Sequence, residues 1–494
     1  MNSKIIFWES DALAFVGLPK SLQEKYNFDI YAIIDVTDKQ KKFFQKQELI
    51  KFSKIWYLHD HISKTTEKSN TEYLKSIEKK YGIDISLLIS NERFFNKWNL
   101  YYKFSSNEKL LILEQECKLF EKILDEVQPD FLITGMTTLH HQHLFYEICK
   151  ARGIKVLMIR SSFFVGKHII SSEFDSIDNT QINGKFHFNS LVDIQNYLKK
   201  YDSTNKVKLE LENLLASKTD YLKAILKFLV SNNTNVKTHY TYYGRSKFAV
   251  LKGIIFNLIK KRCRESFINK NLIRDIKNKK QIIYFPLQIE PERSLLIQAP
   301  NYTNQVKVVT NIAKSLPPGY ELYVKEHPAN VFREWRPIYD NKKIMKLPNV
   351  KLIHPSVKSE DLIKKSSLVI TISSTSGLEA AFYNKPSIIF ADLDYSILPS
   401  VHKIKAIDEL PYAIKVSLKK EVKVSDLNYY INLINANSFE VNFASINSDF
   451  DHNFHYGSFL ADVEIPIEKM RLFLERHNAE FDKIAAECIK KICD

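Results

Sequence analysis

Three short polar clusters in the second half of the chain have residue types that bind phosphate groups. They are PLQIEPE at 286–292, KEHPAN at 325–330 and SSTSGLE at 373–379, and each follows a short apolar run typical of a buried strand. In open α/β sheets, ligands bind at the carboxyl ends of the strands. We therefore expect the three clusters to meet at one edge of a parallel sheet and to form an anion site.

The serine-rich cluster lies between the apolar run SLVITIS and a predicted helix at 377–384. A strand, a loop of small residues and a helix in this order direct several backbone N–H groups toward one place, which suits a phosphate. Capping of the helix explains one or two of the hydroxyls, but four are more than a cap requires. The residues predicted to bind the anion are Ser373, Ser374, Thr375, Ser376 and Gly377.

The second cluster adds an imidazole and an ammonium group. Pro328 keeps His327 out of helical geometry, so the ring is held at the rim of the sheet, where it can donate to a phosphate. Lys325 adds positive charge beside it. A purely structural histidine at a strand end is the alternative. Glu379 could accept hydrogen bonds from a ribose, or could only favour the start of its helix.

The sequence favours no metal site. Asp392-Leu393-Asp394 and Asp449-Phe450-Asp451 have the DxD spacing of metal-binding motifs, but short acidic triplets are frequent by chance. The histidines His140, His141 and His143 do not place two ligands and an acidic third on one helix face, so no zinc site is expected there.

Short apolar runs alternate with amphipathic stretches in two separate parts of the sequence, and these elements must position the polar residues. This pattern predicts an α/β fold with two Rossmann-like, doubly wound domains that face a cleft, a helical insert and a C-terminal helical tail. The predicted parts are an N-terminal acceptor domain at 1–185, a helical insert or linker at 186–275, a C-terminal donor domain at 276–430 and the tail at 431–494.

Composition narrows the class of protein further. A chain of 494 residues with 45% hydrophobic residues is long enough for two cores. We expect a cytoplasmic protein, because no apolar run is long enough to cross a membrane and Glu9 interrupts the apolar segment that a signal peptide would need. The five scattered cysteines form no zinc or disulfide pattern.

The net charge of +15 attracts anionic partners in general. No signature of a common nucleic-acid module accompanies it, so no nucleic acid is expected as a partner. The basic stretch 248–264 could contact the inner face of a membrane, but packing of its apolar face inside the protein is the more common use of such a helix.

The segments YFPLQIEPERS, LYVKEHPAN and ITISSTSGLEAAFYNKPSIIFAD resemble the capsular polysaccharide biosynthesis proteins. That family includes the capsule Kdo transferases and is distantly similar to polysialyltransferases and CDP-glycerol polymerases. The resemblance covers about residues 281–395 and implies a GT-B fold, donor binding in the second lobe and no metal or other cofactor. It implies that His327 and the serine loop hold the donor phosphate and that Gln288 and Glu379 line the nucleotide pocket. Glu290 or Glu292 would replace an acidic residue that often follows PLQ in the family.

The sequence therefore predicts a glycosyltransferase that moves a sugar from a nucleotide donor to a surface polysaccharide or its lipid-linked precursor. A CMP-linked acidic sugar is one candidate donor. Two alternatives stay open: a CDP-polyol phosphotransferase of the teichoic-acid type, and a non-catalytic capsule assembly protein that binds polyanions.

In a two-lobed transferase, the base that deprotonates the acceptor should come from the first lobe, because the donor occupies the second. Glu9 with Asp11 follows the run SKIIFW, and His140 follows the run FLITG. An unperturbed histidine can accept a proton at neutral pH, whereas a carboxylate needs its pKa raised by burial. His140 is slightly favoured over Glu9, and a capping role is the alternative for both.

Overall fold

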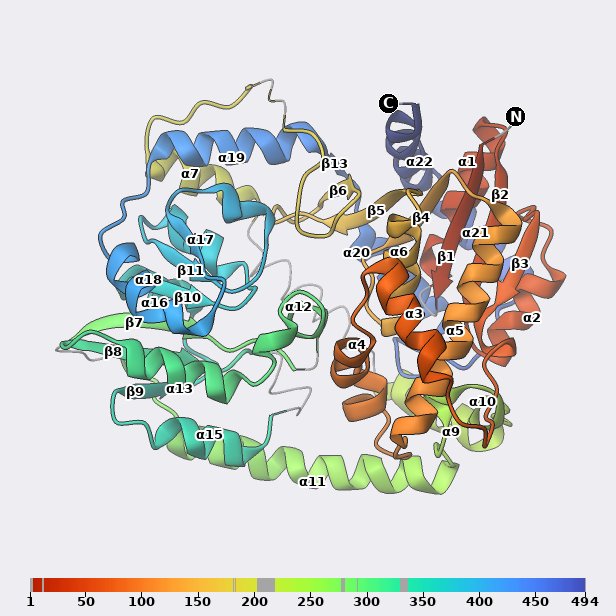
Figure 1. Ribbon diagram of the computed structural model, residues 1–494, viewed down its shortest axis with the longest axis horizontal. Helices are drawn as coiled ribbons and strands as arrows, with labels where there is room; N and C mark the ends of the chain where they lie inside the picture. Colours follow the sequence, from red (N-terminus) through yellow and green to blue (C-terminus); the bar gives the residue numbers. More distant parts are fainter. Residues whose placement is uncertain are drawn as a thin grey trace. The chain divides into compact units, whose positions relative to one another are not determined.

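The computed structural model describes residues 3–10, 13–180, 182, 184–201, 218–276, 280–290, 292–328 and 336–493 (Figure 1). The chain forms two compact units. The first consists of Met1–Asp178, Tyr201–Val250 and Asn437–Asp494, and the second of Asn179–Lys200 and Leu251–Ala436. Each unit has its own mainly parallel sheet between helices, which confirms the predicted α/β fold with two Rossmann-like domains.

The sheet of the first unit has seven strands in the order β13-β6-β5-β4-β1-β2-β3. Strands β1 to β5 are parallel, whereas β6 and β13 extend the sheet antiparallel beyond β5. The strands are β1 (Lys4–Ser10), β2 (Asp29–Asp35), β3 (Lys54–Tyr57), β4 (Phe131–Gly135), β5 (Lys155–Ser161), β6 (Lys167–Ser171) and β13 (Ser438–Glu440).

Helices cover both faces of this sheet (Figure 1). The buried residues of β1 alternate between two cores: Ile5 and Phe7 contribute to one, and Ile6 and Trp8 to the other. The helices are α1 (Gly17–Lys25), α2 (Asp38–Lys46), α3 (Thr71–Tyr81), α4 (Ile85–Asn91), α5 (Ser106–Val127), α6 (His140–Ala151), α9 (Lys218–Val230), α10 (Asn235–Thr238), α20 (Phe443–Phe454), α21 (Ile467–Arg476) and α22 (Asn478–Cys493).

The end of the chain is part of the first core. Phe473 of α21 and Phe481 and Ile484 of α22 are buried in the same cluster as Ile5 and Leu18. A side chain at Gly17 of α1 would meet the Phe481 ring at 2.2 Å, so α22 packs directly on the backbone of α1. Residues 437–494 thus complete the unit that the N-terminus begins.

The sheet of the second unit has six parallel strands in the order β12-β11-β10-β7-β8-β9. The strands are β7 (Gln281–Pro286), β8 (Tyr320–Lys325), β9 (Val350–Ile353), β10 (Ser366–Thr371), β11 (Ser387–Ile389) and β12 (Val401–Lys403). The helices are α7 (Leu191–Leu198), α12 (Arg293–Leu296), α13 (Gln305–Ser315), α15 (Ile338–Met345), α16 (Ser359–Lys365), α17 (Ser376–Phe382), α18 (Leu410–Ser417) and α19 (Val424–Asn437).

The long helix α11 (Lys247–Asn271) contains the basic stretch singled out in the sequence. Of its residues only Ile268 is buried, whereas Phe248, Ile255 and Phe256 are exposed. Its apolar side chains therefore do not form an inward-facing stripe. Among the described residues, no helix has the length and apolar character needed to cross a membrane.

Candidate functional site

The three polar clusters of the second unit lie at the carboxyl ends of neighbouring strands. From β7 the chain proceeds through β8 and β9 to one side of the sheet, and β10 to β12 lie on the other side. The order of strands therefore reverses between β7 and β10, which is the position where open α/β sheets bind ligands. Gln288 follows β7, Lys325 ends β8, and Ser373 follows β10.

Gln288 fixes the conformation of the serine loop. In the orientation in which both the oxygen and the nitrogen of the Gln288 side-chain amide have hydrogen-bond partners, the oxygen lies 2.6 Å from the backbone nitrogen of Ser373 and 2.9 Å from that of Ser374. The Ser373 hydroxyl donates to the carbonyl of Ser294 at 2.7 Å. Two of the N–H groups expected to face an anion are thus occupied by Gln288, so this residue shapes the loop that begins the site.

The other residues of the serine loop make local contacts. The backbone N–H of Ser376 donates to the Ser374 hydroxyl at 3.2 Å, and the Thr375 hydroxyl donates to Glu379 at 2.9 Å. The helix α17 has only seven residues. Its dipole is consequently a minor source of positive charge, and a bound phosphate would depend mainly on side chains.

Gly377 is required by packing. A Cβ at this position would lie 2.6 Å from the hydroxyl oxygen of Tyr395, and that hydroxyl donates to the Ser374 carbonyl at 2.6 Å. Because glycine has no Cβ, the Tyr395 ring can pack against the backbone and bind the loop. Gly377 therefore acts on the shape of the loop through Tyr395.

Lys325 supplies a buried ammonium group at this edge. The residue is 3% exposed, and its Nζ donates to the Ser359 hydroxyl at 3.0 Å. Burial lowers the pKa of Lys325 to about 8, against the opposing effect of the Glu379 and Glu326 carboxylates. Burial also raises the pKa of Glu379 above its usual value, although Thr375 and Lys325 oppose the change. The carboxylates only partly compensate the burial of the Lys325 ammonium, so this group is suited to pair with an incoming anion.

His327 is partly buried directly after β8, as the sequence predicted for a residue at the rim. Its backbone N–H donates to the carboxylate of Glu326 at 3.2 Å. Glu292 is partly buried and precedes the short helix α12. Pro291 and residues 329–335, which include part of KEHPAN, lie outside the described residues.

A buried arginine below the loop was missed by the sequence analysis. Arg336 is 2% exposed, and its guanidinium lies 3.1 Å from Glu326 and 3.2 Å from Glu290. It also donates to the carbonyl of Gln288 at 3.2 Å. Arg336 therefore joins the segments that follow β7 and β8. A single arginine outside any motif gave no signal that could have identified it.

In the first unit, the order of strands reverses between β1 and β4; Glu9 lies near the carboxyl end of β1, and His140 begins the helix that follows β4. Glu9 is 4% exposed, and burial raises its pKa to about 8. Its neighbour Asp11 lies outside the described residues. Among the described residues, no hydrogen bond to the Glu9 carboxylate is found.

His140 lies in a different environment. It is 3% exposed, with Nδ1 2.8 Å from Glu92 and Nε2 3.1 Å from Glu116. Burial alone would lower the pKa of His140, but Glu116 and Glu92 raise it to about 10. Correspondingly, the pKa of Glu92 falls to about 2 because His140 outweighs the effect of burial. Both ring nitrogens are engaged, so neither is free to accept a proton from a substrate.

The acidic triplets are occupied by neighbouring side chains. Asp392 pairs with Lys403, and Asp449 pairs with Arg476 at 2.6 Å. Asp451 lies 3.2 Å from His455. Asp394 accepts a hydrogen bond from the Tyr430 hydroxyl at 3.3 Å, so each of the four carboxylates has a partner within the protein.

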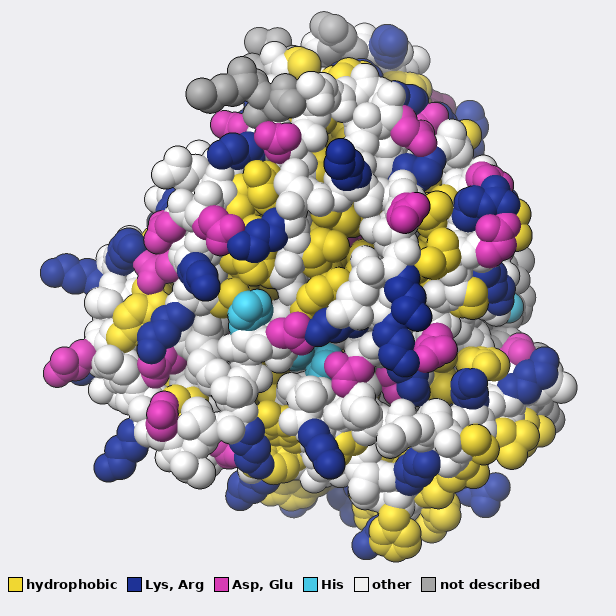
Figure 2. Space-filling view, turned by 90° about the vertical axis from the view of Figure 1, so that its right-hand side faces the viewer, with side chains coloured by type: hydrophobic (Ala, Val, Ile, Leu, Met, Phe, Trp, Pro, Cys, Tyr) yellow, Lys and Arg dark blue, Asp and Glu magenta, His cyan; other side chains and the backbone are white. Residues whose placement is uncertain are grey.

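The first unit also has a hollow of about 770 Å³ bounded by α2, α9 and α20. Asp38, which begins α2 just after the carboxyl end of β2, lies in its wall. The lysines that line it are Lys39, Lys42, Lys223, Lys227 and Lys469. Lys39 and Lys42 pair with Asp462 and Glu464. Lys223 and Lys227 are exposed on α9, where Lys223 lies 3.9 Å from Asp220. On the face shown in Figure 2, basic and acidic side chains are interspersed.

The two Rossmann-like units, each with polar groups at its reversal point, define an α/β protein of the GT-B class. Residues 182–398 match the family model of capsule polysaccharide biosynthesis proteins. The match confirms the resemblance seen in the sequence, and it contains all three polar clusters of the second unit. Comparison with curated protein sequences gave no match.

Structural comparison matched this chain to solved structures that include two Kdo transferases and an epimerase. The KpsC beta Kdo 2,4 transferase of Thermosulfurimonas dismutans is 14% identical, covers 65% of this chain and 86% of its own, and has a TM-score of 0.32. The beta Kdo 2,7 transferase of the same organism is 12% identical over 74% and 96% of the two chains, with a TM-score of 0.28. The UDP-GlcNAc 2-epimerase of Methanocaldococcus jannaschii is 14% identical over 86% and 94%, with a TM-score of 0.24. These TM-scores are too low to transfer a site or an activity to this chain.

Proposed function

We propose that the protein is a glycosyltransferase that transfers a sugar from a nucleotide donor to a capsular or other surface polysaccharide, or to its lipid-linked precursor. The observation that carries the proposal is the buried Lys325 ammonium at the reversal point of the second unit, beside the serine loop and His327. The family match over these residues supports it.

The donor diphosphate or monophosphate would contact Lys325, His327 and the hydroxyls of the serine loop. Charge-assisted hydrogen bonds of this kind are short and strong, and a buried ammonium strengthens them further. Gln288 and Gly377 would act indirectly, because they hold the loop in place. Glu379 and Glu292 are the proposed contacts to the rest of the donor. No metal ion or other cofactor is required in this proposal.

Nucleotides should stabilise the protein against heat. A ligand at 100 times its Kd adds about 2.7 kcal/mol to the free energy of unfolding, so a screen of CMP, CDP, UDP, GDP and their sugars will identify the donor class. Lys325→Met and His327→Ala should each weaken donor binding by about 1.5–3 kcal/mol, as should the Ser374→Ala/Thr375→Ala pair. Lys314→Met is the matched control, because this exposed lysine near the end of α13 is not at the reversal point.

If no nucleotide stabilises the wild type, the donor site is wrong. Equal affinity in well-folded Lys325→Met and wild type would remove the phosphate role of that lysine. Product analysis separates sugar transfer from transfer of a polyol phosphate, because only the latter leaves a new phosphodiester.

We place an anionic acceptor against the lysine-lined hollow of the first unit. Lys223→Glu/Lys227→Glu should raise the KM for the acceptor several-fold and leave kcat at saturation unchanged, because exposed charges attract the acceptor without touching the reacting atoms. The effect should shrink as salt is added. Lys252→Glu/Lys260→Glu makes the same change of charge on α11 and should leave the KM unchanged. An equal effect of both pairs would show that only net charge matters.

A further inference from the structure

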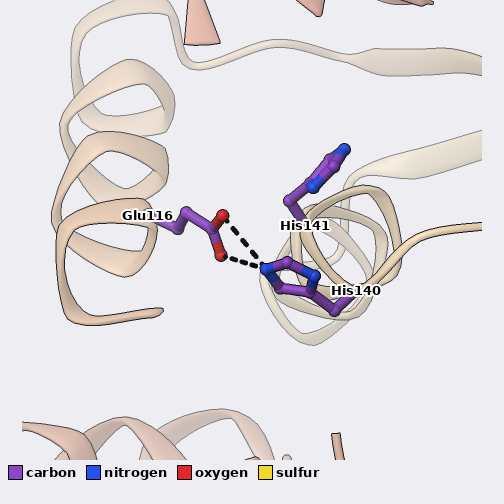
Figure 3. Close-up of side chains that lie close together, drawn as sticks. All are labelled: Glu116, His140 and His141. Carbon is purple, nitrogen blue, oxygen red and sulfur yellow. Dashed lines mark hydrogen bonds and ion pairs between the residues drawn. The ribbon is translucent and has the colours of Figure 1, made fainter. Parts of the chain in front are cut away.

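A buried polar cluster lies below the carboxyl edge of the first sheet. Glu116 comes from α5, and His140 and His141 come from the start of α6 (Figure 3). Tyr240 joins them from the short helix at Tyr240–Tyr242. All four residues are buried, with exposures of 0–3%. None of the four lies among the groups that we propose to bind donor or acceptor.

The inward-facing atoms of the cluster are separated by distances close to those between the ligands of one metal ion. A possible ligand atom from each of Glu116, His140 and His141 lies within 4.8 Å of the others. Both Glu116 oxygens lie 3.1 Å from His140 Nε2 (Figure 3). The Tyr240 hydroxyl lies 3.1 Å from Glu116 and 2.8 Å from His141 Nδ1. Four tetrahedral ligands at about 2.0–2.1 Å from zinc are roughly 3.4 Å apart, so the pairs now in direct contact would have to separate by about 0.3–0.6 Å to admit the ion.

The outer nitrogens of both histidines face carboxylates. Nδ1 of His140 lies 2.8 Å from Glu92, and Nε2 of His141 lies 2.8 Å from Asp35. Histidines that bind metals commonly donate their second N–H to a carboxylate, which fixes the tautomer and the orientation of the ring. In this arrangement Nε2 of His140 and Nδ1 of His141 are left facing inward, on the side of Glu116.

The buried Glu92 and Glu116 and the partly buried Asp35, which also faces His59 at 2.9 Å, surround the two imidazoles. These carboxylates need positive charge nearby, because ionised groups without compensation are costly in the interior. A proton on His140 is one way to supply it, and a divalent cation supplies more. We propose that Glu116, His140 and His141 bind one divalent transition metal ion of the zinc class, with the Tyr240 hydroxyl as fourth ligand. Nitrogen and oxygen ligands of this kind suit zinc.

Such a site would be structural, because it is buried and has four protein ligands. It would join α5, α6 and the segment around Tyr240, which are distant in the sequence. No zinc site was expected from the sequence, because the histidines and an acidic third ligand do not share one helix face. In the structure the carboxylate comes from α5, and His143 is not part of the cluster.

The test is the metal content of the full chain, expressed in zinc-supplemented medium, freed of any histidine tag and dialysed against buffer without metal. The wild type should retain about one equivalent of zinc, and Glu116→Gln and His141→Gln should retain less than about one tenth. Glu92→Gln should bind zinc about 10–100-fold more weakly, because it loses only the outer partner of His140. His143→Gln is the control on the same helix and should bind like the wild type. Cobalt in place of zinc should give the visible absorption of a tetrahedral site.

Folding is checked by circular dichroism, and the full-length wild type decides the result if a variant does not fold. Less than about one tenth of an equivalent of zinc in the folded wild type, even after incubation with Zn²⁺, would overturn the proposal. A protonated His140 would then be the cation of the cluster. Zinc bound equally by wild type and by folded His141→Gln would also overturn it, because the ion would lie elsewhere.

Discussion

Arg336→Met is expected to destabilise the second unit by about 3–5 kcal/mol, because it leaves the buried Glu326 and the partly buried Glu290 without their cation. The guanidinium is 2% exposed and lies within 3.2 Å of both carboxylates. The guanidinium also donates to the backbone carbonyl of Gln288, and the side-chain amide of this glutamine holds the serine loop. Urea unfolding measured by circular dichroism will report the loss.

The control is Arg274→Met, because this exposed arginine of the same unit should cost much less. Arg336→Met/Glu326→Gln should recover part of the loss, since the second change removes one of the unpaired charges. Wild-type stability in Arg336→Met would show that the two carboxylates are protonated or solvated, and that the ion pair does not hold the site together.

Glu9→Gln is expected to lower kcat by about 100-fold or more if Glu9 is the base, because only an ionised carboxylate can accept the acceptor proton. The pKa of about 8 means that wild-type turnover should increase with pH through that value. Donor affinity must be measured separately, because Lys325 loses its charge near the same pH. His140→Gln is not expected to act at the proton-transfer step, since both of its ring nitrogens are engaged.

The same substitution should stabilise the folded protein at alkaline pH. Burial raises the pKa of Glu9 from 4.5 to about 8, so between these values the folded state binds a proton that the unfolded state has released. The contribution of Glu9 to stability is therefore fully present below pH 4.5 and is lost as the pH rises to about 8. Glutamine suffers no such loss, and the difference above pH 8 should be on the order of a few kcal/mol.

Glu48→Gln, at an exposed site of the same unit, should change neither quantity. A Glu9→Gln variant that gains stability but keeps its kcat would place the base elsewhere and leave the burial argument intact. A variant with no change in stability would show that Glu9 is solvated in the folded protein.

Local patterns in the sequence were sufficient to predict the two sheets and the polar edge of the second one. The apolar runs that became β7, β8 and β10 were recognisable by their length and spacing, and the rule for parallel sheets placed Lys325 and Ser373 at one edge. The contacts of each side chain could not be derived in this way. Gln288 was expected to line a nucleotide pocket, and whether it does stays a prediction, but its amide holds the serine loop.

The remaining features depend on residues far apart in the chain. Glu116 meets His140 from another helix, and the Tyr240 hydroxyl contacts Glu116 and His141 from a segment 124 and 99 positions later. Arg336 binds carboxylates that precede it by 10 and 46 positions. Periodicity reports which face of an element is buried, but it does not report which other element covers that face.

The position of the C-terminal helices affects the order in which the protein can fold during synthesis. Ile5 and Cys488 share one hydrophobic core, so the core of the first unit is incomplete until Cys488 has left the ribosome. The second unit is built mainly from Leu251–Ala436 and is synthesised earlier than α21 and α22. The first unit can therefore close only after the second has been synthesised. During that interval the part of the apolar face of α1 that packs on α22 is uncovered, which exposes the nascent protein to aggregation.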